Sequence, residues 1–471
     1  MATDVKPKAR LALAIALHQL GRHKEASEQL SHFGFAQQLA PALWRYNVRE
    51  ADQGTGTVAS QHLAPPAATA AAQQDWHATP VRLFRDAVPP KLRAALCTAF
   101  APEAPFWRET QYASGRHGYY SFFQPGDHSR GASPSDFGVI ERLLQWLRPL
   151  TGIPAGDLLG AEWWVHTRPR HSAGHTMHFD TAENALHLEA LLQHLRKTDA
   201  GTREGECDAK TASVVACHNS DGDDTMLAHP AVSSVIFLSD SPAADGFGPT
   251  IVLDQPASGA SGNPDGSGGD DEGDDEKMLA QRAWIARPVG GSLLLFRGDL
   301  LHGVLPPVAT VDAVEAAGTE EEDGSGTDRR QRCTLMIGWW TRATVERVAH
   351  QRRRQNNSAD AGKLDAVLAR LRYRPCAPVP DVGKGVSWPA MLHDPAFVDG
   401  TGMPDPVDVE LSTGPQPVPV EQVAKPWAPV PPPLVSPELL ASGLEEVPDA
   451  TNQRFFIHSC ADLRPCAAEP Q

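Results

Sequence analysis

Two side chains that could bind a metal ion lie close together in the segment HSAGHTMHFD, His171 to Asp180. His178 and Asp180 are separated by the single residue Phe179. On a β-strand, residues i and i+2 point to the same face, so the imidazole and the carboxylate are expected to converge while Phe179 points away into the core. With a third, distant ligand they would form the two-histidine, one-carboxylate facial triad that binds Fe(II) and leaves coordination positions open.

His302 is the best candidate for the third ligand. It lies among apolar residues in Gly291 to Leu305, a segment that predicts a buried strand, a tight turn and a second strand. A buried imidazole without a polar partner would be unfavourable there. His175 precedes His178 by three residues, but Gly174 argues against the helix that would bring both to one metal. We therefore expect His175 to lie beside the site or to face the substrate.

A receptor for an anionic group is expected on a later strand. Arg332 and Thr334 lie at i and i+2 in RCTLMIGWW and therefore on one strand face. The planar guanidinium offers a fixed fork of donors that matches a carboxylate, and the hydroxyl adds another. Trp164 and His166 share a face of the strand predicted for AEWWVHT, where they could line the same pocket. Core packing explains Trp164 equally well.

The elements that must position these side chains are mostly short strands. Apolar runs bounded by glycine turns predict further strands in VSSVIFL and GFGPTIVLDQ. The chain lacks the regular alternation of strand and helix that builds a parallel sheet, so an antiparallel sandwich or barrel is expected. Flanking helices are also expected. Val81 to Phe100 predicts a strand and then an amphipathic helix, and Asp136 to Leu150 predicts a helix ended by Pro149.

The order of these elements resembles the Fe(II)- and 2-oxoglutarate-dependent dioxygenase superfamily, which includes the prolyl 4-hydroxylases. The resemblance covers roughly residues 81–341. Its landmarks are His178-Phe179-Asp180, Val232 to Asp240, Gly248-Pro249-Thr250, Leu301-His302-Gly303 and Arg332-Cys333-Thr334. The fold that it implies is a double-stranded β-helix core, of the jelly-roll and cupin-like kind, in a mainly β chain with flanking helices (α+β).

The same resemblance implies an activity and its cofactors. Iron would be held by His178, Asp180 and His302, and the far carboxylate of 2-oxoglutarate by Arg332 and Thr334. O2 is the further co-substrate, and ascorbate is an additional candidate. The implied reaction is oxidative decarboxylation of 2-oxoglutarate to succinate and CO2, coupled in most members to hydroxylation.

Three departures from known branches narrow the resemblance. Prolyl 4-hydroxylases of the collagen type have Lys where we place Arg332, so their substrate is not implied. The branch that demethylates nucleic acids has a second Arg six residues after the first, where this chain has Gly338, which disfavours nucleic acid as a partner. Iron-dependent halogenases replace the carboxylate ligand by a small residue, and Asp180 argues against that activity.

Composition shifts divide the chain. Residues 1–50 are rich in Ala and Leu and predict a helical hairpin, part of which resembles one tetratricopeptide repeat. A lone repeat cannot bury its apolar face, so we expect the hairpin to pack on the main domain, with binding of a protein partner as the alternative. Residues 51–75 predict a linker, 76–345 the main domain, and 346–471 further helices and a proline-rich strap.

The formal net charge of −16 is concentrated in two segments. Asp265 to Glu276 and Asp312 to Asp323 contain 13 acidic residues and no basic one. Blocks of like charge repel and stay solvated, so we expect disordered insertions near residues 256–278 and 309–330. Seven scattered cysteines without a CxxC pair argue against a disulfide framework or a structural zinc site. Without a visible secretory signal or membrane-spanning run, we expect an intracellular, soluble protein, cytoplasmic or nuclear, with no membrane partner.

Three functions are compatible with these patterns. The first is an oxygenase that hydroxylates a protein or peptide side chain or a small molecule. The second is a cupin-like zinc enzyme without oxygen chemistry. The third is a non-catalytic interaction protein that uses the N-terminal hairpin and the strap. The sequence does not identify a substrate.

Overall fold

The structure is a computed structural model of the chain. It describes residues 7–31, 37–44, 46, 75–110, 121–126, 138–169, 174–180, 229–239, 247–257, 279–307, 331–346, 376–378, 392 and 415–430. The predicted linker, both predicted acidic insertions and most of residues 346–471 lie outside these ranges. The division of the chain into domains stays a prediction.

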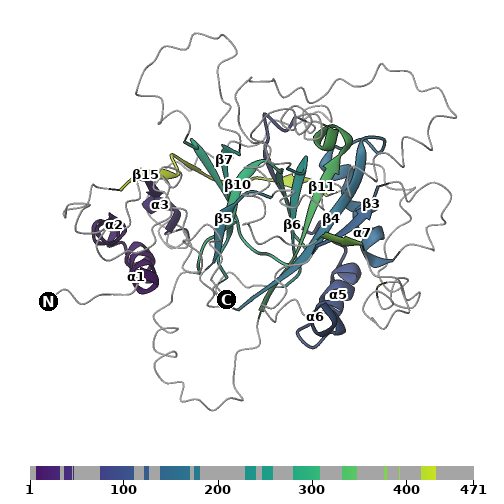
Figure 1. The fold of residues 1–471 in the computed structure, drawn as a ribbon, viewed down its shortest axis with the longest axis horizontal. Coiled ribbons are helices and arrows are strands. Elements are labelled where there is room, and N and C mark those ends of the chain that lie inside the picture. The colour runs from purple at the N-terminus through teal and green to yellow at the C-terminus, as the bar shows by residue number, and fades with distance from the viewer. Residues whose placement is uncertain are drawn as a thin grey trace, which may run out of the picture.

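Two β-sheets form the centre of the molecule (Figure 1). The larger has the strand order β12 (Cys376–Pro378), β3 (Ser121–Pro125), β4 (Leu158–Pro169), β11 (Gln331–Thr341), β6 (Val232–Phe237), β9 (Leu293–Arg297), β2 (Val81–Phe84) and β13 (Pro417–Val418). The smaller has the order β14 (Glu421–Ala424), β8 (Arg282–Ala286), β7 (Thr250–Pro256), β10 (Leu300–Val304) and β5 (His175–His178). Within the part of the chain that the structure describes, neighbouring strands are antiparallel except β12 and β3.

The chain passes back and forth between the two sheets. β4, β6, β9 and β11 belong to the larger sheet, while β5, β7, β8 and β10 belong to the smaller one. This connectivity is that of a double-stranded β-helix, so the predicted fold is confirmed. Apolar side chains of both sheets meet in one cluster between them, including Leu83, Trp164, Phe237 and Phe296 from the larger sheet and Val252, Trp284 and Leu300 from the smaller.

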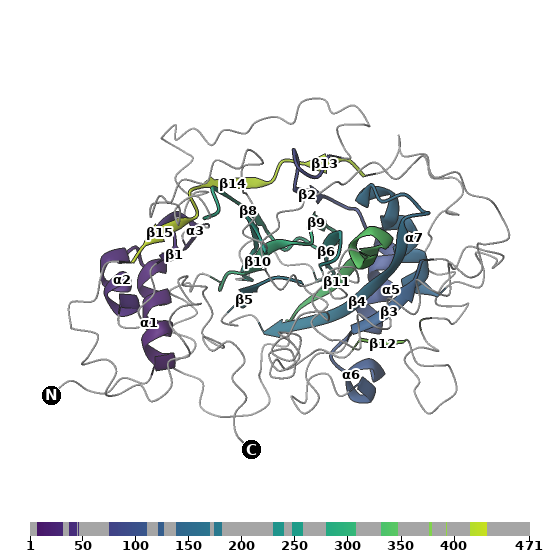
Figure 2. The same cartoon turned by 45° about the horizontal axis from the view of Figure 1, so that its top comes forward.

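Helices cover the outer face of the larger sheet. α5 (Pro90–Ala99), α6 (Pro105–Thr110) and α7 (Val139–Thr151) lie on the side of β3 and β4 (Figures 1 and 2). Their buried side chains share a cluster with outward-facing strand residues such as Ile236 and Leu335. The prediction that Pro149 ends α7 was wrong. Proline has the φ angle of a helix, and the helix ends after Thr151, where Gly152 takes a left-handed φ of +69°.

The N-terminal hairpin covers the outer face of the smaller sheet. α1 (Pro7–Gln19) and α2 (His23–Ser31) are followed by β1 (Gln37–Leu39) and the short helix α3 (Pro41–Trp44). Their apolar side chains, among them Ile15, Leu30, Leu43 and Trp44, share a cluster with Ile251, Leu301 and Leu305. The apolar face that a lone repeat would leave open is therefore buried within this protein.

The described part of the proline-rich region, residues 415–430, runs along the edges of both sheets (Figure 2). β13 pairs with β2, β14 pairs with β8, and β15 (Trp427–Pro429) pairs with β1 of the N-terminal hairpin. The indole of Trp427 is buried and donates to Gln255 Oε1 at 3.0 Å. This segment thus has the extended, packed conformation expected of a strap.

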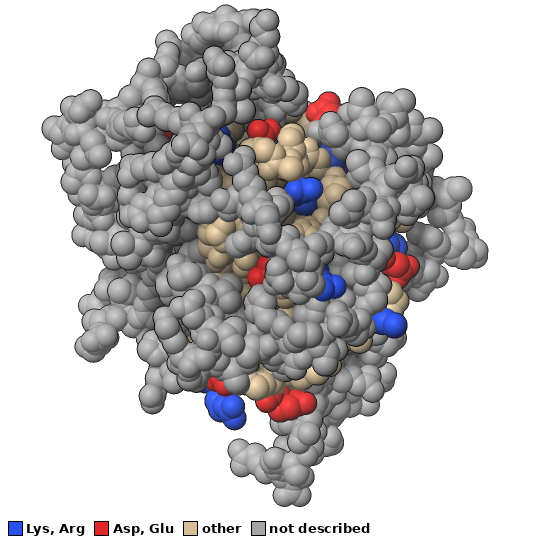
Figure 3. Space-filling view, turned by 90° about the vertical axis from the view of Figure 1, so that its right-hand side faces the viewer, with Lys and Arg blue, Asp and Glu red and all other residues tan. Residues whose placement is uncertain are grey.

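The surface and the helices show two further features. Among the described helices, none is long and apolar enough to span a membrane. On the face shown in Figure 3, the basic side chains that are drawn in blue are scattered among acidic ones rather than gathered into a patch.

His18 is a buried histidine inside the N-terminal hairpin. Its ring stacks on Trp44 with a centroid distance of 5.2 Å, and its Nε2 donates to Gln38 Oε1 at 3.1 Å. Burial lowers the pKa of His18 to about 4, and nearby His23 acts in the same direction while the bond to Gln38 opposes it. The folded protein therefore keeps this imidazole neutral.

We predict that acid weakens the packing of the hairpin through His18. Between pH 6.5 and about 4 the unfolded chain binds a proton at His18 that the folded chain does not, so the free energy of unfolding falls as the pH falls. This decrease in the free energy of unfolding is at most about 3 kcal/mol. In His18→Gln, whose amide can still donate to Gln38, this part of the pH dependence should disappear. Urea unfolding of both proteins at pH 7 and pH 4.5 measures it, and equal losses of stability would contradict the prediction.

Candidate metal centre

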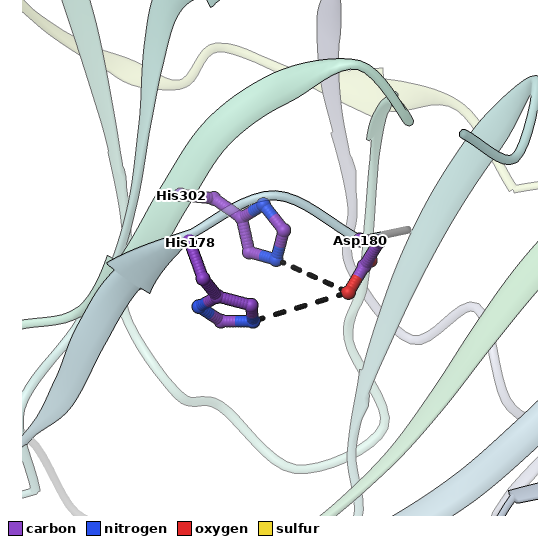
Figure 4. A group of neighbouring side chains, drawn as sticks. All are labelled: His178, Asp180 and His302. Atoms are coloured by element: carbon purple, nitrogen blue, oxygen red, sulfur yellow. Dashed lines mark ion pairs between the residues drawn. The ribbon is translucent and has the colours of Figure 1, made fainter. Parts of the chain in front are cut away.

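Three predicted ligands meet at one point between the sheets. In the register of β10 and β5, His302 lies opposite His178, so both imidazoles project from the same face of the smaller sheet. His302 Nε2 lies 3.6 Å from Asp180 Oδ1, and His178 Nε2 lies 3.9 Å from the same oxygen. Figure 4 shows the three side chains directed toward one another. One atom from each lies within 4.8 Å of the others, close enough for a single metal ion.

The structure corrects one detail of the sequence interpretation. β5 ends at His178, so Asp180 lies just beyond the strand instead of on it. Its carbonyl oxygen accepts a bond of 2.7 Å from the ring of His229, which precedes β6. Phe179 packs into the cluster under the N-terminal hairpin, as expected, and therefore points away from the three ligands.

Hydrogen bonds fix which atoms face the metal position. His302 Nδ1 donates to Leu300 O at 3.0 Å, so Nε2 is the ring nitrogen that is directed at Asp180. Ser233 Oγ donates to Asp180 Oδ2 at 2.7 Å. Because Oδ2 is occupied by Ser233, Oδ1 is the carboxylate oxygen that remains for a metal. Such outer hydrogen bonds fix the orientation of the ligands for metal binding.

The electrostatics of the centre suit a cation. Burial by itself raises the pKa of Asp180, but His302, His178 and the bond from Ser233 hold that pKa well below its usual range. Burial lowers the pKa of His302, but the neighbouring Asp180 carboxylate outweighs it and raises the pKa. An ionised carboxylate and two imidazole nitrogens at this spacing are the ligand set of the facial triad. The side chain of His178 is 37% exposed, whereas His302 and Asp180 are buried, so the centre is open on the His178 side.

A cavity extends from the three ligands between the sheets. It is lined by residues of both sheets: Trp164, His166, Arg168, His175, His178, Asp180, Ser234, Val235, Thr250, Phe296, His302, Gly303, Val304, Arg332, Thr334 and Met336. All four residues that the sequence placed at the co-substrate pocket, Trp164, His166, Arg332 and Thr334, are among them. The sequence does not decide between site and core for Thr250 and Trp340. Thr250 lines the cavity, whereas Trp340 is buried elsewhere and donates to Glu162 at 3.2 Å.

Arg332 is a buried cation at the cavity wall. Its Nη1 donates to Gly248 O at 2.5 Å and its Nη2 to Thr250 Oγ1 at 2.9 Å. Its Nε is buried without a hydrogen-bond partner among the described atoms. Burial lowers the pKa of Arg332 to about 9, with Arg168 adding repulsion and Tyr46 acting in the opposite direction. The guanidinium is therefore charged at neutral pH, and a cation at the cavity wall suits a carboxylate in the cavity.

His175 lies beside the metal position and is not one of the three ligands. Its ring contacts His178 edge-on at a centroid distance of 4.7 Å and lies 5.7 Å from His166. Burial, with added repulsion from His178 and Arg168, lowers its pKa well below the ordinary value. The expectation that His175 stands next to the site agrees with this placement.

Sequence reasoning missed several residues of the site. Ser233, His229 and Arg168 were not singled out, although two serines inside the apolar strand VSSVIFL are a usable signal. Alternation along β6 turns the two serines to opposite faces of the sheet, but the sequence does not say which of them contacts the metal ligands. The structure shows that Ser233 faces Asp180, whereas Ser234 Oγ accepts from Trp339 Nε1 at 2.6 Å.

The chain was compared with known proteins. No protein-family model and no curated protein matches the sequence. Solved structures that match include a prolyl 4-hydroxylase from Pseudomonas putida, with 17% identity over 58% of this chain and 98% of that one and a TM-score of 0.29. A prolyl hydroxylase from Trichoplax adhaerens, in complex with a hypoxia inducible factor peptide, has 11% identity over 58% and 89% and a TM-score of 0.27. HygX from Streptomyces hygroscopicus, with nickel and 2-oxoglutarate bound, has 14% identity over 56% and 83% and a TM-score of 0.25.

The strands of this chain have the order of a double-stranded β-helix, and His178, Asp180 and His302 form a group that could hold a metal ion. Matches at such low identity and TM-score do not extend to activity or substrate. The fold follows from the order and register of the strands, and the ligand set follows from the positions of His178, Asp180 and His302.

We predict that Ser233 sets the metal affinity of this centre. Ser233→Ala frees Asp180 Oδ2, and the loss of such an outer hydrogen bond should weaken Mn(II) binding by about 10- to 100-fold. Ser234→Ala is the matched control, because Ser234 also lies at the cavity, but its hydroxyl accepts a hydrogen bond from Trp339 Nε1 and does not contact Asp180. Titration of both variants with Mn(II) by calorimetry tests this. Equal affinities in the two variants would argue against a role for Ser233 at the metal.

Proposed function

We propose that this protein is an Fe(II)- and 2-oxoglutarate-dependent oxygenase that acts as a hydroxylase. The observation that carries this proposal is a single cavity that contains a facial triad and also a buried arginine with an unsatisfied donor. 2-Oxoglutarate has a chelating keto acid at one end and a second carboxylate at the other. The two kinds of group in the cavity match the two ends of this molecule.

The residues of the chain have separate roles in this reaction. His178, Asp180 and His302 would hold Fe(II), which with 2-oxoglutarate and O2 supplies oxidative decarboxylation to succinate and CO2 and the oxygen atom for the substrate. Arg332 and Thr334 would bind the far carboxylate of 2-oxoglutarate.

Neighbouring side chains keep these groups in place. Ser233 and the carbonyl of Leu300 hold the metal ligands in one orientation. Thr250 holds Nη2 of the guanidinium that faces the far carboxylate. Apolar walls from Trp164, Phe296 and Met336 limit the water that reaches the cavity.

A zinc enzyme without oxygen chemistry is the second candidate, because zinc also binds histidine and carboxylate ligands. Arg332 favours the oxygenase. A zinc hydrolase or isomerase has no general need for a buried guanidinium beside the metal site, whereas a dicarboxylate co-substrate does. The substrate class remains a protein or peptide side chain or a small molecule, and the cavity walls do not distinguish the two.

We predict that the triad is required for turnover of 2-oxoglutarate. Asp180→Asn removes the negative charge that neutralises the cation. The loss of an outer partner of a metal ligand costs about 10- to 100-fold, and a change to the ligand itself should lower Fe(II)-dependent release of CO2 from 1-labelled 2-oxoglutarate by at least that much. Asp254→Asn is the control, because Asp254 lies on β7 and pairs with the partly exposed Arg282 at 3.0 Å, away from the cavity. Turnover of 2-oxoglutarate that survives in Asp180→Asn, or that zinc supports as well as Fe(II), would contradict the oxygenase proposal.

We also predict that Arg332 selects for the far carboxylate. In Arg332→Met the loss of a buried charged partner should weaken 2-oxoglutarate binding to the Mn(II)-loaded protein by roughly 30-fold or more. Binding of 2-oxobutanoate, which has the keto acid but no second carboxylate, should change little. Arg332→Lys keeps a charge but not the planar fork, so its affinity for 2-oxoglutarate should lie between those of the wild type and Arg332→Met. If Arg332→Met lost affinity for 2-oxoglutarate and 2-oxobutanoate equally, the arginine would have a structural role only.

A further inference from the structure

The backbone of Leu305 to Pro307, which follows β10 and its ligand His302, is held by the N-terminal segment, defined here as residues 7–31, 37–44 and 46. Tyr46 Oη donates to Pro306 O at 3.0 Å. Gln19 Nε2 donates to Pro307 O, also at 3.0 Å. Tyr46 is only 3% exposed, so water does not compete for its bond. Two side chains of the N-terminal segment therefore bind two consecutive carbonyl groups of the core.

Two glycines pack against the same backbone. A Cβ atom on Gly248 would lie 1.6 Å from Leu305 O, and one on Gly174 would lie 2.9 Å from Pro306 N. Such distances leave no room for a side chain. The Leu305 N–H also donates to Pro249 O at 3.0 Å. The positions of both glycines are thus set by the backbone that the N-terminal segment holds.

The carbonyl oxygens of these two glycines hold the two arginines of the cavity. Gly248 O accepts from Arg332 Nη1 at 2.5 Å, and Gly174 O accepts from Arg168 Nη1 at 2.8 Å. A shift of Leu305 to Pro307 would move both glycines and therefore both guanidinium groups. Tyr46 is also near enough to Arg332 to oppose the fall in the pKa of Arg332 that burial and Arg168 cause.

The main chain of Tyr46 is held as firmly as its hydroxyl. The Tyr46 carbonyl oxygen accepts from Arg287 Nη2 at 2.9 Å, and Arg287 in turn lies 3.6 Å from Glu421 of the strap strand β14. Tyr46 is also a member of the apolar cluster beneath the smaller sheet. Its hydroxyl is therefore presented to Pro306 by a rigid support.

We propose that Tyr46 and Gln19 are positioning residues for the co-substrate, which act through Leu305 to Pro307 and Gly248 on the guanidinium of Arg332. This inference rests on the proposed function. It assigns the N-terminal segment a role inside the enzyme: the segment completes the end of the cavity that binds the far carboxylate of 2-oxoglutarate. The metal ligands are held by other hydrogen bonds, from Ser233 to Asp180 and from His302 to the carbonyl of Leu300.

The test measures ligand binding to the full chain loaded with Mn(II). Tyr46→Phe removes only the hydroxyl, and Gln19→Ala removes only the amide, so each should weaken 2-oxoglutarate binding by about threefold to tenfold, the effect of one hydrogen bond. The Mn(II) dissociation constant and the binding of 2-oxobutanoate should stay within about twofold of wild type, because neither depends on Arg332. Trp44→Phe is the control, because it removes a different hydrogen bond of the N-terminal segment, the one from Trp44 Nε1 to Leu39 O.

A double substitution separates positioning from general damage. In the Arg332→Met background, Tyr46→Phe should have no further effect on 2-oxoglutarate affinity, because residues that act through one group are not additive. Wild-type affinity for 2-oxoglutarate in both Tyr46→Phe and Gln19→Ala would overturn the inference. Equal losses for 2-oxoglutarate and 2-oxobutanoate would overturn it too. A wild-type protein that binds no 2-oxoglutarate at all would instead overturn the proposed function.

Discussion

An ionised carboxylate in the interior is the constraint on which the rest of the structure depends. A buried carboxylate without partners takes up a proton instead of staying charged. Asp180 stays charged because two elements of the fold supply its partners: the pairing of β10 with β5 aligns His302 and His178, and β6 supplies Ser233. A change of register by one residue would turn these side chains to the opposite face.

The cavity contains two groups of opposite charge, Asp180 and Arg332, that do not pair with each other. A divalent cation at the first and a dianion at the second add no net charge to the cavity. In the proposed complex the cation would meet the Asp180 carboxylate, and the far carboxylate would meet the guanidinium of Arg332 at the cavity wall. Separation of the two charges favours the joint binding of metal and dicarboxylate over either one alone.

The parts of the site that the sequence predicted are those that follow from alternation along one strand. His178, His302, Arg332 and Thr334 were placed by period-two spacing and by the order of their motifs. Local spacing could not give the hydrogen bond between His229 and the carbonyl oxygen of Asp180, and the short strand β8 was not predicted. The contacts of Tyr46 also escaped prediction, because its partner Pro306 is 260 residues away and only the folded chain brings them together.

The pairing of β1 with β15 joins strands from opposite ends of the described chain. During synthesis β1 is made early, yet its partner leaves the ribosome only after every strand of the β-helix. Closing so long a loop is entropically costly, and the helices and the larger sheet can form without it. The outer face of the ligand-bearing sheet is therefore covered last. Until then its apolar residues, such as Ile251 and Leu301, are exposed to other nascent chains, so this face is where a chaperone would have most to protect.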